Sequence, residues 1–313
     1  MKIVIYLLTI TLLTLAPFLG QLPIELTNIT DSTTIDYKLF WSIRLPRVLV
    51  AFFAGAILSL GGLLFQSIFK NPMSTPYTLG VATGSTLGVA IAIVFGFASY
   101  LSIFGFLGAL ITVIVLFGVT LRLNGYQTNA LLLVGIALAF FYNASLMILF
   151  YLSNESQSFE IIRFTMGSVE VVGLNTIVPI IIASIALLAV TIRFKKELKL
   201  LLTSNNYAYL KGLNIKKINT LFLVSVSIAV GICVSLTGPI GFVGLIVPHI
   251  VKNIYKKSAE KLIFPIFFYG GFFLVISDLI SRNLGTSSSI PIGVVTALLG
   301  GPFFIYLILK NKN

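Results

Sequence analysis

Long apolar runs separated by short polar segments make up most of this chain. Ten ranges are apolar enough to predict helices that cross a membrane. They are 2–19, 48–68, 77–97, 101–121, 129–151, 171–193, 218–237, the shorter 240–255, 262–281 and 292–309. The first range resembles a signal peptide, but no small-x-small cleavage site follows it cleanly, so we interpret it as a retained helix. The pattern predicts an all-α polytopic membrane protein with about ten transmembrane helices.

One long polar stretch interrupts the apolar runs, RFKKELKLLLTSNNYAYLKGLNIKKINTL at 193–221. Its apolar positions predict two short amphipathic helices, broken near 203–206 and at Gly212. Six of its residues are lysines, which places it in the cytoplasm by the positive-inside rule. We predict that about 195–217 forms a platform that docks another protein. A solvated basic loop is the alternative.

Composition agrees with a membrane protein, since 58% of the residues are hydrophobic and only 10% are charged. A net charge of +12 is compatible with nucleic-acid binding, but the basic residues lie in loops between apolar ranges. Membrane orientation explains them better, so we expect no nucleic-acid partner. The single cysteine, Cys233, excludes an intrachain disulfide and a cysteine-based metal site. We predict one transmembrane domain over 1–313.

The distribution of charge supports a topology with both termini in the cytoplasm. With ten spans, five of the 21 basic residues lie outside and 16 inside. The outside set is Lys38, Arg44, Arg47, Arg163 and Arg282. Of the acids in loops, only Glu197 and Glu260 lie inside. An error of one span would destroy this segregation.

The arginines follow a different pattern from the lysines. Fourteen of 15 lysines are predicted inside, whereas four of six arginines are predicted outside. Arginine suits forked contact with carboxylates, so Arg44, Arg47 and Arg282 are candidates for docking an acidic partner. The alternative is pairing with lipid headgroups or within the chain, because Asp278 lies one helical turn before Arg282.

The sequence lacks the residues that ATP binding, metal binding and ion coupling usually require. GVATGSTLG at 80–88 lacks the lysine of a P-loop, so we expect no ATP binding by this chain. His249 has no neighbouring ligand that would make a metal site. Apart from Asp278 and Glu170, near the outer surface, we expect no ionisable group to be buried in the middle of a span, which disfavours an ion-coupled carrier. Such a carrier and a membrane-embedded enzyme remain the alternative classes.

Small residues indicate close helix packing. Gly80, Gly84 and Gly88 recur every four residues, which allows two helix backbones to approach each other. Glycines at 238–244 precede Pro248, where we expect a short or broken helix.

Three blocks resemble the FecCD family of ABC-importer permeases. They are RLPRVLVAFFAGAILSLGGLLFQSIFKNPMSTPYTLG at 44–80, GPIGFVGLIVPHIVKNI at 238–254 and SDLISRNLGTSSSIPIGVVTALLGGPFFIYLILK at 277–310. The polar stretch 198–218 resembles the family's coupling loop, with Asn205 and Asn206 in place of a frequent acidic pair. The resemblance covers essentially the whole chain.

This resemblance implies the permease fold of a type II ABC importer in a prokaryotic cytoplasmic membrane. Two permease subunits, identical or paralogous, would enclose the substrate path. Two ATPase subunits would bind ATP and Mg, so this chain would hold no cofactor or metal and have no catalytic residue. An extracytoplasmic binding protein would deliver the substrate. Iron–siderophore is the expected substrate class, with haem and cobalamin as alternatives.

The resemblance also implies roles for particular residues. Docking of the binding protein falls to Arg44, Arg47 and Arg282. The cytoplasmic gate falls to Asn71, Met73, Thr128 and Asn129. The translocation path falls to Gly135, Asn143 and Ser145. Coupling to the ATPase falls to Leu198, Asn205, Asn206, Tyr209, Leu210 and Gly212.

Overall fold

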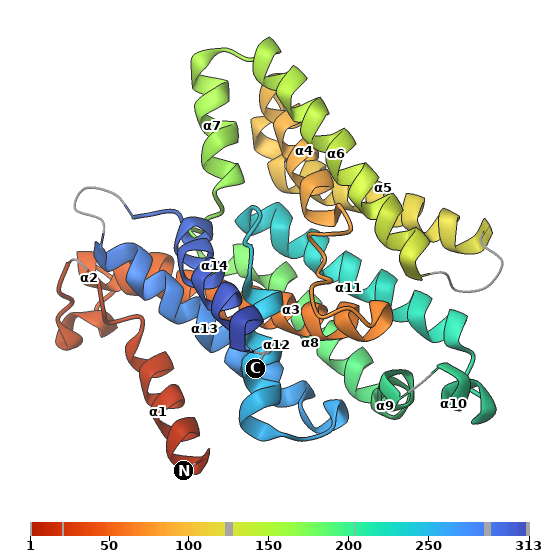
Figure 1. Ribbon diagram of the computed structural model, residues 1–313. Coiled ribbons are helices and arrows are strands. Elements are labelled where there is room, and N and C mark those ends of the chain that lie inside the picture. The colour runs from red at the N-terminus through yellow and green to blue at the C-terminus, as the bar shows by residue number, and fades with distance from the viewer. Residues whose placement is uncertain (1, 21, 123–127, 204, 285–288, 311–313) are drawn as a thin grey trace.

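The computed structural model describes residues 2–20, 22–122, 128–203, 205–284 and 289–310, and all regular elements within these ranges are helical (Figure 1). The first half contains α1 (Lys2–Leu15), η1 (Leu26–Thr30), α2 (Ile35–Lys38), η2 (Leu39–Arg44), α3 (Leu45–Phe69), α4 (Val81–Val94), η3 (Ala98–Tyr100), α5 (Leu101–Arg122), α6 (Thr128–Leu152) and α7 (Glu155–Thr165). The second half contains η4 (Leu174–Ile177), α8 (Val178–Arg193), α9 (Lys195–Thr203), α10 (Asn205–Leu210), α11 (Ile215–Thr237), α12 (Val243–Tyr255), η5 (Ala259–Lys261), α13 (Ile263–Leu284) and α14 (Ile292–Lys310).

The all-α polytopic prediction is confirmed, and a helix occurs in each of the ten predicted ranges. Within the described ranges, six helical stretches are long and apolar enough to cross a membrane: Ile35–Phe69, Ala98–Val119, Asn129–Leu152, Leu174–Arg193, Ile215–Thr237 and Ile263–Leu284. The same part of the chain has three shorter apolar helices, at Val81–Val94, Val243–Tyr255 and Ile292–Ile305. The chain therefore has several helices that can cross a membrane, and the exact number of ten crossings stays a prediction.

Three predicted helices begin later than the apolar pattern suggested. The sixth range starts at 171, but α8 begins only at Val178, after η4. The other two begin after a residue in a left-handed conformation. The third predicted range starts at 77, but α4 begins at Val81, after Gly80 in a left-handed conformation with φ of 77°. The eighth starts at 240, but α12 begins at Val243, after Phe242 with φ of 67°. Apolar residues continue through both irregular segments, so hydropathy alone could not separate them from the helices. Non-helical backbone of this kind is tolerated in a membrane where protein surrounds it.

The pattern of apolar runs missed α7, a polar helix between α6 and α8. Its start has a capping box, in which Asn154 accepts from the backbone N–H of Gln157 and the Gln157 side chain accepts from the backbone N–H of Asn154. The Gln157 amide also donates to the carbonyls of Ile93 and Val94 at 3.2 and 3.1 Å. These carbonyls belong to the last turn of α4, so one side chain begins α7 and fastens it to α4.

Helix α3 lies at the centre of the bundle and packs against α13, α11, α12 and α8. A second group consists of α4, α5 and α6, and α11 contacts members of both groups. The predicted close approach on α4 is confirmed, since a side chain at Gly84 or Gly88 would collide with the backbone of α5. Tight backbone contact thus replaces large side chains between these two helices.

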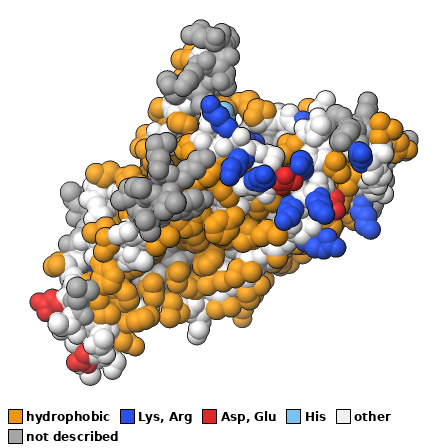
Figure 2. Space-filling model, turned by 90° about the horizontal axis from the view of Figure 1, so that it is seen from below, with side chains coloured by type: hydrophobic (Ala, Val, Ile, Leu, Met, Phe, Trp, Pro, Cys, Tyr) orange, Lys and Arg blue, Asp and Glu red, His pale blue; other side chains and the backbone are white. Residues whose placement is uncertain are grey.

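The two ends of the molecule differ in charge. Elements α2 and α7 lie toward the left of Figure 1, and α9 and α10 lie at its lower right. We call these the α7 end and the platform end, the latter formed by α9, α10 and η5. Figure 2 shows lysine and arginine side chains gathered over one region of the surface, separated by a broad hydrophobic band from acidic side chains at the opposite corner. This arrangement matches the charge segregation expected of a membrane protein.

Candidate functional site

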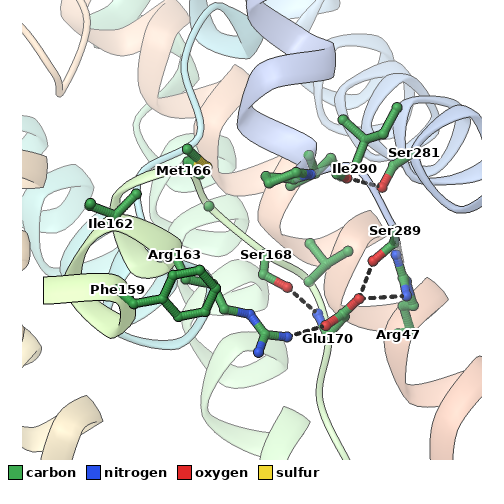
Figure 3. A pocket seen from close by; sticks show the side chains of 14 residues that line it. Arg47, Phe159, Ile162, Arg163, Met166, Ser168, Glu170, Ser281, Ser289 and Ile290 are labelled. Carbon is green, nitrogen blue, oxygen red and sulfur yellow. Dashed lines mark hydrogen bonds and ion pairs between the residues drawn. The ribbon is translucent and has the colours of Figure 1, made fainter. Parts of the chain in front are cut away.

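At the α7 end, five charged residues form a continuous row, which we call the charged cluster. In spatial order they are Arg163, Glu170, Arg47, Asp278 and Arg282. The guanidinium of Arg163 lies 3.0 Å from Glu170, and that of Arg47 lies 3.2 Å from the same carboxylate (Figure 3). Positive and negative groups alternate, and they come from α7, the segment 166–173, α3 and α13. The cluster therefore holds together three regions that are distant in sequence: α3, α13 and the stretch formed by α7 and 166–173.

Asp278 is the buried centre of this cluster, with 0% of its surface exposed. Its Oδ1 accepts a 2.7 Å hydrogen bond from Nε of Arg47, and its Oδ2 lies 3.5 Å from Nε of Arg282. Arg282 also donates from a terminal nitrogen to the carbonyl of Ala16 at 2.8 Å. A carboxylate removed from water needs such partners, because an unpaired buried charge is strongly destabilising.

Glu170 is the more exposed of the two carboxylates, with 36% of its side chain accessible. One oxygen accepts from Arg47 and from the Ser289 hydroxyl, while the other accepts from Arg163 (Figure 3). Burial raises the pKa of this carboxyl. The Ser289 hydrogen bond and the charges of Arg47 and Arg163 together lower it by more, so the pKa lies below its usual value. Glu170 is therefore ionised and links α3, α7 and the segment before α14.

A cavity of about 460 Å³ lies beside this carboxylate. One wall is apolar and comes chiefly from α7, with Phe159, Ile162 and Met166. The opposite wall is mixed: Arg47 and Ser289 are polar, and Ile290 is apolar (Figure 3). Glu170 and Arg163 lie between the two walls. Apolar and charged side chains therefore line the same cavity.

Arg44, at the end of η2, is buried with 7% exposure. Its terminal nitrogens donate to the carbonyls of Phe18, at 3.1 Å, and Leu22. The three arginines predicted for docking thus lie at one end of the molecule, and each has partners within the chain. The pairing of Asp278 with Arg282, left open by the sequence, is confirmed, and docking stays a prediction.

The platform end presents two short helices, as the leucine spacing predicted. In α9, Leu198 and Leu201 are buried against the bundle. In α10, Tyr209 and Leu210 are 75% and 81% exposed. Gly212 then ends α10 in a left-handed conformation with φ of 76°, which only glycine adopts at little cost. Helix α9 anchors the platform, and α10 offers a free apolar surface.

An ion pair ties the platform to the loop before α13. Nζ of Lys199 on α9 lies 3.1 Å from Glu260 in η5. The hydrogen bond from Lys199 lowers the pKa of the Glu260 carboxyl below its usual value. Both groups face solvent, so this pair positions the platform more than it stabilises the fold.

The predicted gate residues lie at two helix ends: Asn71 and Met73 in the turn after α3, and Thr128 and Asn129 at the start of α6. Asn71 closes a turn by accepting a 2.9 Å hydrogen bond from the backbone of Met73, whose side chain is half exposed. Asn129 is exposed in the first turn of α6. The side chains of Thr128, Asn205 and Asn206 lie outside the described residues. The role of these helix ends at a gate stays a prediction.

The predicted path residues on α6 point in different directions. Gly135 is buried, and a side chain there would meet Leu79 just before α4 at 2.6 Å, so it is a packing position in this chain. Asn143 is exposed, and the Ser145 hydroxyl is turned back onto the carbonyl of Phe141 at 2.9 Å. Of the three, Asn143 alone presents a polar group at the free face of α6.

Sequence reasoning missed Glu170 and Ser289 as organisers of the α7 end, and counted Arg163 only as an outward charge. No local pattern joins residues 47, 163, 170 and 289. Among the residues that the structure describes, no group of three histidine, cysteine, aspartate or glutamate side chains is placed to hold a metal ion.

Comparison with known proteins gives concordant matches. The model of the FecCD transport family matches residues 7–310. The haemin transport system permease protein HmuU of Yersinia pestis is 31% identical over 308 residues, covering 94% of this chain and 91% of its own length. The vitamin B12 import system permease protein BtuC of Photorhabdus laumondii is 34% identical over 278 residues, covering 87% and 82%. A solved structure of a metal-chelate type ABC transporter in an inward-facing conformation superposes with a TM-score of 0.88 at 27% identity, covering 98% and 99%.

Proposed function

Because the chain belongs to the FecCD transport family and is thus a permease subunit of an ABC importer, we propose that its substrate is an iron–siderophore chelate. The observation that carries the proposal is the superposition over 98% of the chain with a transporter of the metal-chelate type. The match includes the platform and the α7 end, so it is not confined to the membrane helices.

The proposed assembly has two permease subunits, two ATPases and one binding protein. The exposed apolar surface of α10 supports an ATPase contact at the platform end, which is then cytoplasmic, as are both termini. The arginines of the α7 end support contact with an acidic binding protein outside the membrane. ATP and Mg belong to the ATPases in this scheme, and the energy of hydrolysis moves the permease between outward-facing and inward-facing states.

A cytoplasmic gate is part of the proposal. Asn71, Met73, Thr128 and Asn129 would meet their counterparts across the axis of the permease dimer. Cysteine at 73 or 129 should then form crosslinks between subunits to a degree that depends on bound nucleotide. Equal crosslinking in every nucleotide state would argue against a gate at these positions.

Haem and cobalamin are the second candidates, because relatives named for haemin and vitamin B12 transport match most of the chain. The deciding experiment measures uptake of ferric hydroxamate, ferric catecholate, haemin and cyanocobalamin by proteoliposomes that contain the permease, its ATPase and its binding protein. We expect ATP-dependent uptake of a ferric chelate. Uptake of haemin or cyanocobalamin alone would replace the iron–siderophore proposal while leaving the importer function intact.

A further inference from the structure

Glu170 occupies the position that a docking carboxylate would need. Two guanidiniums, those of Arg47 and Arg163, point at it, together with the Ser289 hydroxyl (Figure 3). We propose that this is a carboxylate-exchange site: an acidic side chain of the binding protein displaces Glu170 and takes over Arg47 and Arg163. This inference rests on the proposed importer function and adds a competing internal ligand and a further docking residue, Arg163.

The geometry separates a fixed from an exchangeable partner on Arg47. Its Nε is committed to Asp278 at 2.7 Å, and that carboxylate is fully buried on a helix. Its terminal nitrogen instead contacts Glu170 at 3.2 Å, and Glu170 is 36% exposed. One side of the fork therefore holds the arginine in place while the other faces a carboxylate within reach of solvent.

The backbone around Glu170 allows the side chain to move without unfolding the segment. Segment 166–173 is fastened near one end by the bond from Ser168 N to the carbonyl of Thr237, 2.7 Å, and at the other by the bond from Gly173 N to the carbonyl of Ser42, 2.8 Å. Between them the Glu170 backbone N–H is held only by the Ser168 hydroxyl, at 3.1 Å. Exchange needs a rotation of the Glu170 side chain between fixed ends.

The adjoining cavity supplies the space for both carboxylates. Its volume of about 460 Å³ exceeds that of one side chain, and Arg47, Arg163 and Glu170 all line it. The apolar wall of Phe159, Ile162 and Met166 would contact the aliphatic stem of an incoming glutamate. Since the cluster contains three arginines and two acids, a further carboxylate is favoured by its net positive charge.

Exchange would link docking of the binding protein to the packing of the α7 end. Glu170 joins α3, α7 and the segment before α14 while it holds Arg47, Arg163 and Ser289. A carboxylate from another protein would release this connection, and α7 would then be held by the partner instead. Docking of the binding protein and loosening of the contacts within the α7 end thus become one event.

The test measures docking of the cognate binding protein, free of ligand, to the full transporter in nanodiscs. Glu170→Gln keeps the shape of the side chain and weakens its contacts with both arginines. We expect it to dock about 3- to 10-fold more tightly than wild type at low salt, with the gain shrinking as salt is added. Ser289→Ala removes one holder of Glu170 without changing charge and should give a gain of about 2-fold.

Glu160→Gln is the matched control, because Glu160 is an exposed acid on α7 that takes part in no ion pair within the described residues. It makes the same charge change and should leave affinity within about 1.5-fold of wild type. Arg163→Gln should weaken docking more in the Glu170→Gln background than alone, since exchange makes the two effects interdependent.

The outcomes separate the two proposals. If the wild-type transporter does not dock the binding protein at all, the proposed function fails. If wild type docks but Glu170→Gln and Ser289→Ala bind equally well or more weakly, exchange is wrong and the importer assignment stands. An equal gain in Glu160→Gln would reduce the effect to general charge repulsion and also overturn exchange.

Discussion

The two ends of the molecule use charge in opposite ways. At the α7 end, Arg44, Arg47 and Arg282 are largely withdrawn from solvent and bonded to carboxylates or backbone carbonyls. At the platform end, the basic side chains face outward around an exposed apolar helix, and Lys199 pairs with Glu260 at the surface. The first arrangement is an interlocked structure, and the second is an open surface.

This difference teaches that a charged residue predicted to lie outside the membrane is not necessarily free to bind another protein. A guanidinium that is already paired must lose a partner before it binds another, whereas an exposed helix is available at once. We therefore expect mutations at the α7 end to affect stability first and docking second. Mutations on α10 should affect coupling with little change in stability.

The largest effect should come from Asp278→Asn, which tests whether the α7 end is truly interlocked. Removing this charge leaves Arg47 and Arg282 buried without their shared carboxylate. We expect the free energy of unfolding to fall by about 3–5 kcal/mol. Thermal denaturation of the purified protein in detergent measures this, with Glu160→Gln as control. A stability equal to that of the control would mean that the cluster is not structurally required.

The next effect sharpens the contrast within the platform. Leu210→Asp, on the exposed face of α10, should reduce transport-coupled ATP turnover by at least about 10-fold and change stability by less than about 0.5 kcal/mol. Leu198→Asp, on the buried face of α9, should instead destabilise the fold by about 3 kcal/mol or more because it buries a charge. Paired melting and ATPase measurements on the two variants decide this. Coupled turnover that survives Leu210→Asp would remove α10 from the ATPase contact.

A smaller effect is expected from Arg47→Lys, which keeps the charge and removes the fork. Lysine has one ammonium and cannot reproduce both the Nε contact with Asp278 and the contact with Glu170. We expect a loss of about 1–2 kcal/mol in stability and weaker docking of the binding protein. Denaturation and binding measured on the same preparation provide the check. A lysine variant indistinguishable from wild type would show that charge alone suffices there.

The smallest effect concerns the exposed pair of Lys199 and Glu260. The lysine lowers the pKa of Glu260, so its stabilising contribution is present above the ordinary glutamate value of 4.5 and disappears as pH falls through the lowered folded value. Melting curves of wild type and Lys199→Gln should therefore differ slightly at neutral pH and converge in acid. A difference that grows on acidification would contradict this assignment.

The sequence predicted most of the helices and the division of the platform, because both follow from local spacing of apolar residues. Leu198, Leu201 and Leu202 predicted α9 by their spacing. Tyr209, Leu210 and Leu213 predicted α10 in the same way. Helix α7 was missed because it is polar, although Asn154 followed three residues later by Gln157 is a capping-box signal.

The charged cluster could not be predicted in the same way. Its members come from positions 47, 163, 170, 278 and 282, and only the last two lie within one helix. The carbonyl partners of Arg44 and Arg282, at Phe18, Leu22 and Ala16, leave no side-chain pattern at all. Tertiary packing determines which arginines are paired, and a single sequence does not record it.

The central claim is that the platform end meets an ATPase and the α7 end meets the binding protein. A photoreactive amino acid at Leu210, on α10, or at Phe159, on α7, tests this most directly in the assembled transporter. Both side chains are well exposed, at 81% and 69%. We predict that position 210 gives an adduct with the ATPase only, and position 159 an adduct with the binding protein only. An ATPase adduct at position 159, or no ATPase adduct at position 210, would contradict the account.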